Sequence, residues 1–238
     1  MLDLSRFAVL SFDCYGTMID WEAGIFAALR PVLAAHNKRV NDVTLLKIYS
    51  ELELEAEQQT YVSYREVLQS VIRGFGKRMG FDCSEDEIGS LPESLAAWQP
   101  FPDTVEALRE LKTRYQLAVI SNIDDDLFAL TAPKLGVEFD QVVTAQQARC
   151  YKPCQRIFQI ARERIGVDPK RWLHIGQSIY HDVIPAQAMG LAAVWVNRPS
   201  PREGAGATKS VAGKPDLEVS SLKELVELVS SSVGSRID

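Results

Sequence analysis

The chain has 238 residues, 46% of them hydrophobic, which is enough for one substantial domain or for a core domain with a smaller one. A net charge of −6 argues against a nucleic-acid-binding surface, and no apolar stretch is long enough to predict a membrane helix. The four cysteines, Cys14, Cys83, Cys150 and Cys154, form neither a CxxC pair nor a zinc-binding spacing, which favours free thiols in a cytoplasmic protein.

The first predicted element is a buried strand over residues 8–12, followed directly by the acid Asp13. A short apolar run that stops at a turn is typical of a central strand in a parallel sheet. Such sheets bind ligands just beyond the carboxyl ends of their strands, so we expect Asp13 at the mouth of a crevice. Gly16 allows a tight turn there, and Thr17 can hold the acid by a local hydrogen bond. The alternative is an Asp that only caps the next segment.

Residues 18–98 are predicted to be helical throughout, with no strand pattern between the helices. Asp20 is a good N-cap residue, and Ser84 opens a capping box. The predicted helices cover residues 22–35, 43–59, 64–79 and one or two stretches within 84–98. We therefore expect a helical cap subdomain at 18–98, inserted into a core domain made of 1–17 and 99–238.

Beyond residue 98 the pattern changes to an alternation of strands and helices. Strands are predicted at 117–122, 141–145, 171–176 and 192–196, helices at 101–115, 125–135, 153–165, 182–189 and 221–229, and an exposed loop at 199–215. Right-handed crossovers between such strands give a parallel sheet. The predicted class is therefore α/β, a Rossmann-like doubly wound parallel sheet core with an inserted helical cap.

Polar residues follow four of the predicted strands, and the carboxyl ends of parallel strands share one edge of the sheet. They are Asp13, then Ser121 and Asn122, then Lys152, and finally Gln177, Ser178 and Asp182. A carboxylate attacks well only when it is desolvated, held and ionised, and the positive charge of Lys152 can keep Asp13 ionised. Asp182 can fix Lys152 or orient a water, although it could simply cap its helix. His174 lies within a strand, so a buried core histidine is the better interpretation.

These residues resemble the four motifs of the haloacid dehalogenase superfamily, in order. Residues 13–17, Asp-Cys-Tyr-Gly-Thr, are similar to its first motif, D-x-[D or Y]-G-T. Tyr15 stands where phosphatase members carry a second Asp, as in the L-2-haloacid dehalogenase (type II) branch. Ser121, Lys152 before a proline, and the acidic stretch ending at Asp182 match the other three motifs.

The resemblance implies a hydrolase that converts a short 2-haloacid to a 2-hydroxy acid through an ester on its nucleophilic Asp. It implies the catalytic residues Asp13, Thr17, Lys152 and Asp182, and the substrate-binding residues Tyr15, Ser121, Asn122, Gln177 and Ser178. Asn122 would contribute to the halide site and Ser121 would bind the substrate carboxylate. No metal ligand and no required cofactor are implied. The expected partners are a small anionic substrate and a second copy of the chain, in a cytoplasmic homodimer.

Some positions depart from the dehalogenase pattern. An early cap Arg that contacts halide and carboxylate has no clear equivalent, and the nearest basic candidates are Lys47 and Arg65. A Tyr that follows the motif Lys is replaced by Phe158. Two alternatives therefore stay open, a magnesium-dependent small-molecule phosphatase and a non-catalytic relative that binds an anion. Trp21 and Trp98 flank the expected cap and are candidates to line the substrate entrance, although burial of apolar surface explains them equally well.

Overall fold

The computed structural model describes residues 2–199 and 211–234, and within them six parallel strands form one sheet in the order β3-β2-β1-β4-β5-β6. The strands are β1 (Val9–Phe12), β2 (Gln116–Ser121), β3 (Gln141–Thr144), β4 (Trp172–Gly176), β5 (Ala192–Val196) and β6 (Leu217–Val219). The helices are α1 (Trp21–Ala35), α2 (Asp42–Glu57), α3 (Tyr64–Met79), α4 (Glu85–Ser94), α5 (Thr104–Lys112), α6 (Asp125–Thr131), α7 (Ala145–Ala148), α8 (Gln155–Ile165), α9 (Ile184–Ala188) and α10 (Leu222–Gly234).

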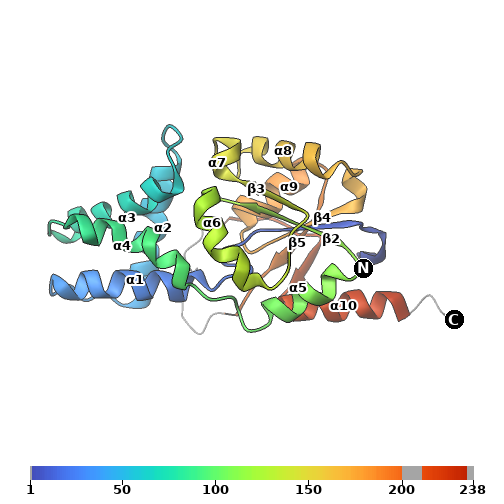
Figure 1. Ribbon diagram of the computed structural model, residues 1–238, viewed down its shortest axis with the longest axis horizontal. Helices are drawn as coiled ribbons and strands as arrows, with labels where there is room; N and C mark the ends of the chain where they lie inside the picture. Colours follow the sequence, from blue (N-terminus) through green and yellow to red (C-terminus); the bar gives the residue numbers. More distant parts are fainter. Residues whose placement is uncertain (1, 200–210, 235–238) are drawn as a thin grey trace.

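Strand β1 is central and fully buried, with β2 on one side and β4 on the other. Its side chains alternate between two hydrophobic clusters, as the pleat of a strand requires. Val9 packs into the cluster that includes residues of α8 and α9, and Leu10 into the cluster that includes residues of α5 and α10. Figure 1 shows these two helical layers above and below the sheet. The order reverses between β1 and β4, so the ligand crevice of a doubly wound sheet is expected where these strands end.

The predicted α/β class is confirmed, and the differences from the predicted elements are local. Strand β6 was not predicted, because three residues are too short to show an alternating pattern. The helix predicted from residue 182 begins earlier, as the π-helical turn η5 (Ile179–Val183), and continues as α9. Of the loop predicted at 199–215, residues 211–215 are irregular and 200–210 lie outside the described residues. The four cysteines are free thiols.

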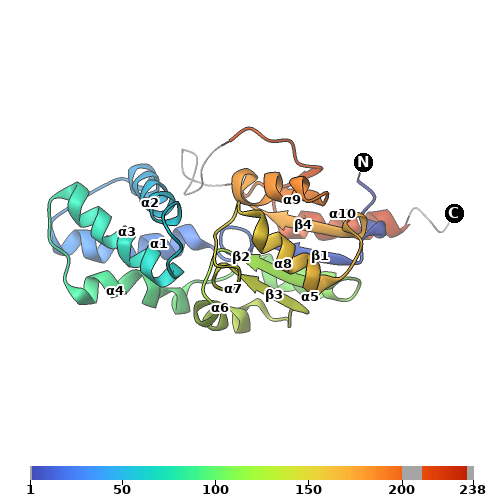
Figure 2. The ribbon, with the colours of Figure 1, turned by 90° about the horizontal axis from the view of Figure 1, so that it is seen from above.

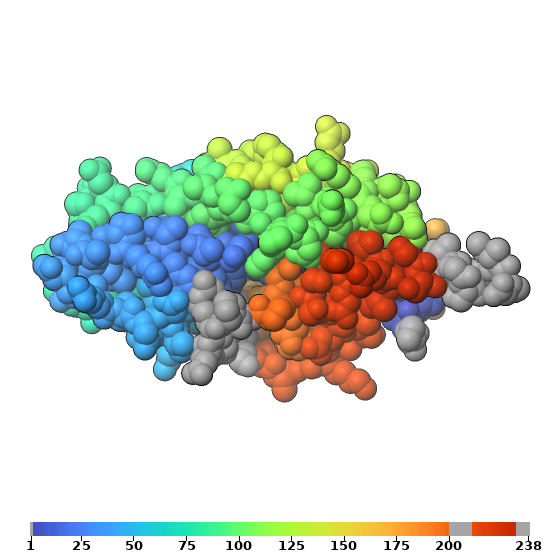
Figure 3. Space-filling model, turned by 90° about the horizontal axis from the view of Figure 1, so that it is seen from below, coloured from blue at the N-terminus to red at the C-terminus, as the bar shows by residue number. Residues whose placement is uncertain are grey.

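Helices α1–α4, here called the cap helices, lie between β1 and β2 in the chain and together at one end of the sheet (Figures 1 and 2). The space-filling view shows α1 in blue at this end and α10 in red at the other (Figure 3). Each of the last three cap helices has an Asn or Ser N-cap, and α3 and α4 both begin with a full capping box. No helix of the described part of the chain is long and apolar enough to cross a membrane.

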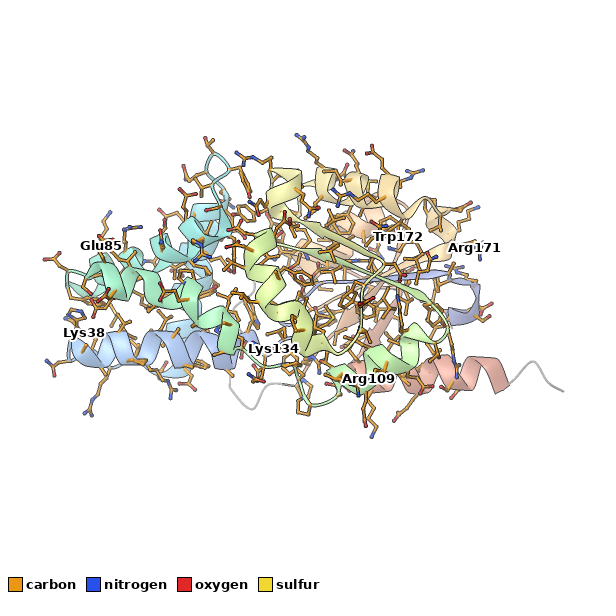
Figure 4. The ribbon with its side chains drawn as sticks, viewed as in Figure 1. Lys38, Glu85, Arg109, Lys134, Arg171 and Trp172 are labelled. Carbon is orange, nitrogen blue, oxygen red and sulfur yellow. The ribbon has the colours of Figure 1, made fainter. Side chains whose placement is uncertain are left out.

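Trp98 closes the junction between the cap helices and the sheet. Its indole is buried, packs edge-on against Tyr15 with ring centroids 5.8 Å apart, and covers Gly24 of α1. A Cβ atom at Gly24 would lie 2.4 Å from the Trp98 ring, so only glycine allows this close packing. Lys134, labelled in Figure 4 beside this junction, donates from Nζ to the Trp98 carbonyl oxygen at 2.8 Å. Trp98 therefore supports the junction, and it is not part of the pocket lining described below.

Candidate active site

Asp13 follows β1 directly, and a tight turn holds its carboxylate at the end of the sheet. Its backbone N–H donates to the carbonyl of Ile175 on β4 at 2.9 Å. Thr17 Oγ1 donates to Asp13 Oδ2 at 2.9 Å, which is the local hydrogen bond predicted for this residue. Gly16 makes the turn possible at φ +89°, a region that favours glycine. Burial raises the pKa of the Asp13 carboxyl, because the charged form loses water.

Lys152 binds Asp13 from the loop that follows α7. All three hydrogens of its buried ammonium have an acceptor: Asp13 Oδ1 at 2.8 Å, Asp182 Oδ1 at 2.6 Å and the Ile120 carbonyl at 2.9 Å. Burial lowers the pKa of the Lys152 ammonium, but the two carboxylates outweigh burial and raise it above its ordinary value. Lys152 therefore stays charged. It opposes the upward shift of the Asp13 pKa without cancelling it.

Asp182 holds Lys152 from the other side. Burial favours a higher pKa for its carboxyl, but Lys152 and His174 lower the pKa below its usual range. The Ser178 backbone N–H donates to Asp182 Oδ2 at 3.1 Å. Gly176 makes room for this carboxylate, because a Cβ atom there would lie 2.4 Å from Asp182 Cγ. Asp182 is thus fully enclosed and bonded on both oxygens.

A buried chain of hydrogen bonds continues from Asp182 into the sheet. Trp172 Nε1 donates to Ser11 Oγ at 2.7 Å, Ser11 Oγ lies 2.8 Å from His174 Nδ1, and His174 Nε2 lies 3.3 Å from Asp182 Oδ1. Trp172, labelled in Figure 4, lies in the sheet region, away from the cap helices. Because Ser11 Oγ accepts from Trp172, its own hydrogen can donate to Nδ1, which places the histidine hydrogen on Nε2 toward Asp182. The sequence interpretation of His174 as a buried core residue agrees with its position, but its link to Asp182 was missed.

A pocket of about 50 Å³ opens above Asp13, which is room for only a small substrate. Every predicted site residue except Thr17 lines it; the lining is Asp13, Tyr15, Trp21, Glu53, Glu57, Tyr64, Ser121, Asn122, Lys152, Gln177, Ser178, His181 and Asp182. Thr17 lies just behind, where its Oγ1 also accepts from the Gln177 backbone N–H at 2.9 Å.

Three predicted binding residues differ in the hydrogen bonds that their side chains already form with the protein. The Ser121 hydroxyl is buried and has no hydrogen-bond partner within the described part of the chain. Asn122 Oδ1 accepts from the Lys152 backbone N–H at 2.7 Å, and its amide nitrogen lies 3.4 Å from both the Lys152 carbonyl oxygen and Glu57 Oε1. The Tyr15 hydroxyl is hydrogen-bonded to Thr131 Oγ1 at 2.8 Å, so the ring serves as a wall. Of the two tryptophans, Trp21 lines the pocket.

The cap side of the pocket carries three residues that sequence reasoning did not select, Glu53, Glu57 and Tyr64, here called the cap wall. Glu53 Oε1 accepts from the Tyr49 hydroxyl at 2.9 Å and from the Tyr64 hydroxyl at 2.6 Å. Burial raises the pKa of Glu53 to about 7 and raises that of Glu57 well above its ordinary value. A signal was present in the sequence, because two acids four residues apart on a helix share one face.

The basic residues considered for the cap side do not reach the pocket lining. Lys47 is exposed. Arg65 is partly exposed and forms an ion pair with Asp126 at 2.7 Å, between helices α3 and α6. The cap wall therefore presents carboxyl groups where a basic residue was sought.

The model of the haloacid dehalogenase-like hydrolases matches residues 7–190, which is well over half of the chain. This chain belongs to that family. It is 25% identical over 231 residues to an (S)-2-haloacid dehalogenase of Pseudomonas sp. (strain YL), covering 94% of this chain and 95% of the relative. It is 36% identical to a glyceraldehyde 3-phosphate phosphatase of Methanothermobacter thermautotrophicus, over 105 residues that cover 43% of this chain and 46% of the relative.

Among solved structures, the fold is similar to an L-2-haloacid dehalogenase from Xanthobacter autotrophicus with chloropropionic acid covalently bound. The TM-score is 0.78 at 20% identity, and the match covers 94% of this chain and 98% of that one. This likeness supports the sheet order and the placement of the cap helices. At that identity the chemistry has to be argued from the residues of the site.

Proposed function

We propose that this chain hydrolyses the carbon–halogen bond of a short 2-halogenated carboxylic acid, or a close derivative, through an ester on Asp13. The observation that carries the proposal is the pair of Asp13 and Lys152, 2.8 Å apart at the base of a small pocket. A carboxylate that has lost most of its water is a stronger nucleophile, and the Lys152 ammonium compensates the buried charge. Relatives named as (S)-2-haloacid dehalogenases support this choice of reaction.

The reaction proceeds in two displacements that balance in atoms and charge. An Asp13 oxygen forms a bond to the halogen-bearing carbon while the carbon–halogen bond breaks, and the halide leaves with the bonding electrons. Water then attacks Cγ of the Asp13 ester, the bond from Cγ to the ester oxygen breaks, and one proton is released overall. The product hydroxyl thus keeps the original Asp13 oxygen, and Asp13 regains an oxygen from water.

The phosphatase alternative needs a general acid and carboxylate ligands for magnesium. Tyr15 occupies the position of the acid and its hydroxyl is bonded to Thr131, while Gln177 offers an amide in place of a carboxylate. Both carboxylate oxygens of Asp182 already accept hydrogen bonds from protein donors. This donor set supports a reaction that requires no cofactor. The similarity to a phosphatase over part of the chain is the reason to keep a phosphate ester in the test.

The domain organisation and the oligomeric state are two further parts of the proposal. We also propose that residues 18–98 act as a cap subdomain over a core of 1–17 and 99–238, and that the active protein is a cytoplasmic homodimer. Size-exclusion chromatography with light scattering would measure the oligomeric state.

The test is halide release from chloroacetate, 2-chloropropionate and chloroacetamide by the purified protein, with and without magnesium, and beside phosphate release from a monophosphate ester. We expect metal-independent halide release that Asp13→Asn reduces on the order of 10⁴-fold. A single turnover in heavy-oxygen water should label the peptide that contains Asp13. If none of the three chlorinated compounds released halide and the monophosphate ester released phosphate in the presence of magnesium, the proposal would be overturned.

A further inference from the structure

The cap wall places two carboxyl groups in the pocket that the proposed nucleophile also lines. Glu53 and Glu57 are four residues apart on α2, so they project from one face of the helix. Glu53 is fixed by the hydroxyls of Tyr49 and Tyr64, and Glu57 Oε1 accepts from the Asn122 amide at 3.4 Å. These are neutral donors. Neither carboxyl forms an ion pair with another of the described residues.

Among the described residues that line the pocket, Lys152 is the one with a permanent positive charge, and its hydrogens are already engaged. A lysine ammonium has three hydrogens, and Lys152 uses all of them on protein oxygens. His181, the other lining residue with a basic side chain, is hydrogen-bonded to Ser178. A substrate carboxylate would therefore enter a pocket that holds four carboxyl groups and one ammonium, namely those of Asp13, Glu53, Glu57, Asp182 and Lys152.

A second observation points independently to a polar ligand group in the same space. Ser121 lines the pocket and is 1% exposed, and its hydroxyl has no hydrogen-bond partner among the residues that the structure describes. A buried hydroxyl without a partner is costly, so a bound group is expected to satisfy it. A serine hydroxyl can accept as well as donate, and a ligand N–H would suit both this oxygen and the acceptor oxygens of the cap wall.

We propose that Glu53 and Glu57 determine specificity, selecting a substrate whose non-reacting end carries N–H donors and disfavouring a free carboxylate at that end. This inference rests on the proposed function, because the halogen-bearing carbon still has to reach Asp13. The N–H group sits against the cap wall and Ser121, where carboxyl and hydroxyl oxygens accept its hydrogens. An amide and an amidinium both present N–H donors. The amidinium is charged and carries donors on both nitrogens, whereas the amide is neutral and keeps a carbonyl oxygen.

Chloroacetate, chloroacetamide and chloroacetamidine separate these cases, because they share the reacting carbon and the leaving group. Halide release and the hydroxylated product are measured at pH 8, with Asp13→Asn subtracted as background. Turnover must exceed four equivalents, since each of the four thiols could release one halide by alkylation. We expect kcat/KM for the better of the two nitrogen compounds to exceed that for chloroacetate at least about 10-fold. The amidine leads if charge decides, and the amide leads if hydrogen bonding alone decides.

Glu57→Gln and Glu53→Gln provide the decisive variants, because they keep the shape of the side chain and replace the ionisable carboxyl by a neutral amide. We expect the preference to shrink about 5-fold or more, chiefly through faster turnover of chloroacetate. Glu55→Gln is the matched control, because Glu55 is exposed on the same helix and absent from the pocket lining. Thermal unfolding of each variant establishes that it is folded.

The outcomes distinguish the two proposals. If no compound releases halide beyond four equivalents, the proposed function fails. If chloroacetate is the best substrate and the Glu57→Gln and Glu53→Gln variants leave the ratio unchanged, the proposed function stands and the specificity inference is wrong.

Discussion

The base of the pocket and the cap wall use the same kind of side chain in opposite ways. At the base, Asp182 is enclosed, yet its pKa is lowered because an ammonium lies 2.6 Å away. In the cap wall, Glu53 also accepts two hydrogen bonds, yet burial raises its pKa to about 7 because both donors are neutral phenols. The difference shows that a nearby charge, more than the number of hydrogen bonds, decides whether a buried carboxyl stays ionised.

Removing the Lys152 ammonium should abolish the difference in carboxyl pKa between the base and the cap wall. We expect this change to have the largest effect on stability. Lys152→Met leaves Asp13 and Asp182 buried without a counter-ion, so we expect a loss of about 3–5 kcal/mol in the free energy of unfolding near neutral pH. The loss should be smaller at pH 5, where both carboxyls, their pKa values now raised, can take up protons. Denaturant unfolding at the two pH values measures both effects.

Lys112→Met is the matched control for that substitution. Lys112 pairs with Asp140 at 2.5 Å, but both side chains are about a third exposed or more. An exposed pair of this kind contributes less than about 1 kcal/mol. If Lys152→Met cost no more than Lys112→Met, the ammonium would not be compensating two buried charges.

A smaller effect is expected from the cap wall, and its pH dependence has the opposite sign. Because the folded pKa of Glu53 is raised to about 7 from an ordinary 4.5, its stabilising contribution is complete below pH 4.5 and lost as the pH rises through 7. We expect the wild type to lose roughly 2–3 kcal/mol of stability from this group between pH 5 and pH 8. Glu53→Gln should remove that loss, which unfolding measurements across the range would detect. Glu55→Gln should leave the slope unchanged, and an equal slope in all three proteins would contradict the shift.

The base of the pocket was predictable from sequence because each of its residues lies at or beyond the end of a strand. Asp13 follows β1 directly and Ser121 ends β2. Lys152 and Asp182 lie in the segments that follow β3 and β4, and the geometry of a parallel sheet brings such segments together. No comparable rule predicts the position of the cap wall from sequence. Which face of α2 meets the pocket depends on how the cap helices pack, and local sequence spacing shows that Glu53 and Glu57 share a face without saying where it points.

The hydrogen-bonded chain behind Asp182 could be predicted from sequence only in part. Ser11 and His174 are paired across β1 and β4, and that register required the structure. Ser11→Ala leaves the Trp172 indole N–H without its acceptor, and we expect a loss of about 1–2 kcal/mol. Turnover should fall only a few-fold, since His174 acts through Asp182. Ser70→Ala on the exposed face of α3 is the control, and an equal loss in both would show that the buried chain adds nothing.

The smallest expected effect tests whether the cap helices supply a positive charge after all. Arg65 pairs with Asp126 at 2.7 Å, with side chains 39% and 64% exposed. We expect Arg65→Ala to change stability by less than about 0.5 kcal/mol and kcat/KM for chloroacetate by less than about 2-fold. Steady-state halide release measures the second quantity. A 10-fold loss for chloroacetate, with chloroacetamide unaffected, would mean that Arg65 leaves Asp126 to bind the substrate carboxylate. In that case the cap would be basic toward its ligand, and the contrast between base and wall would not govern specificity.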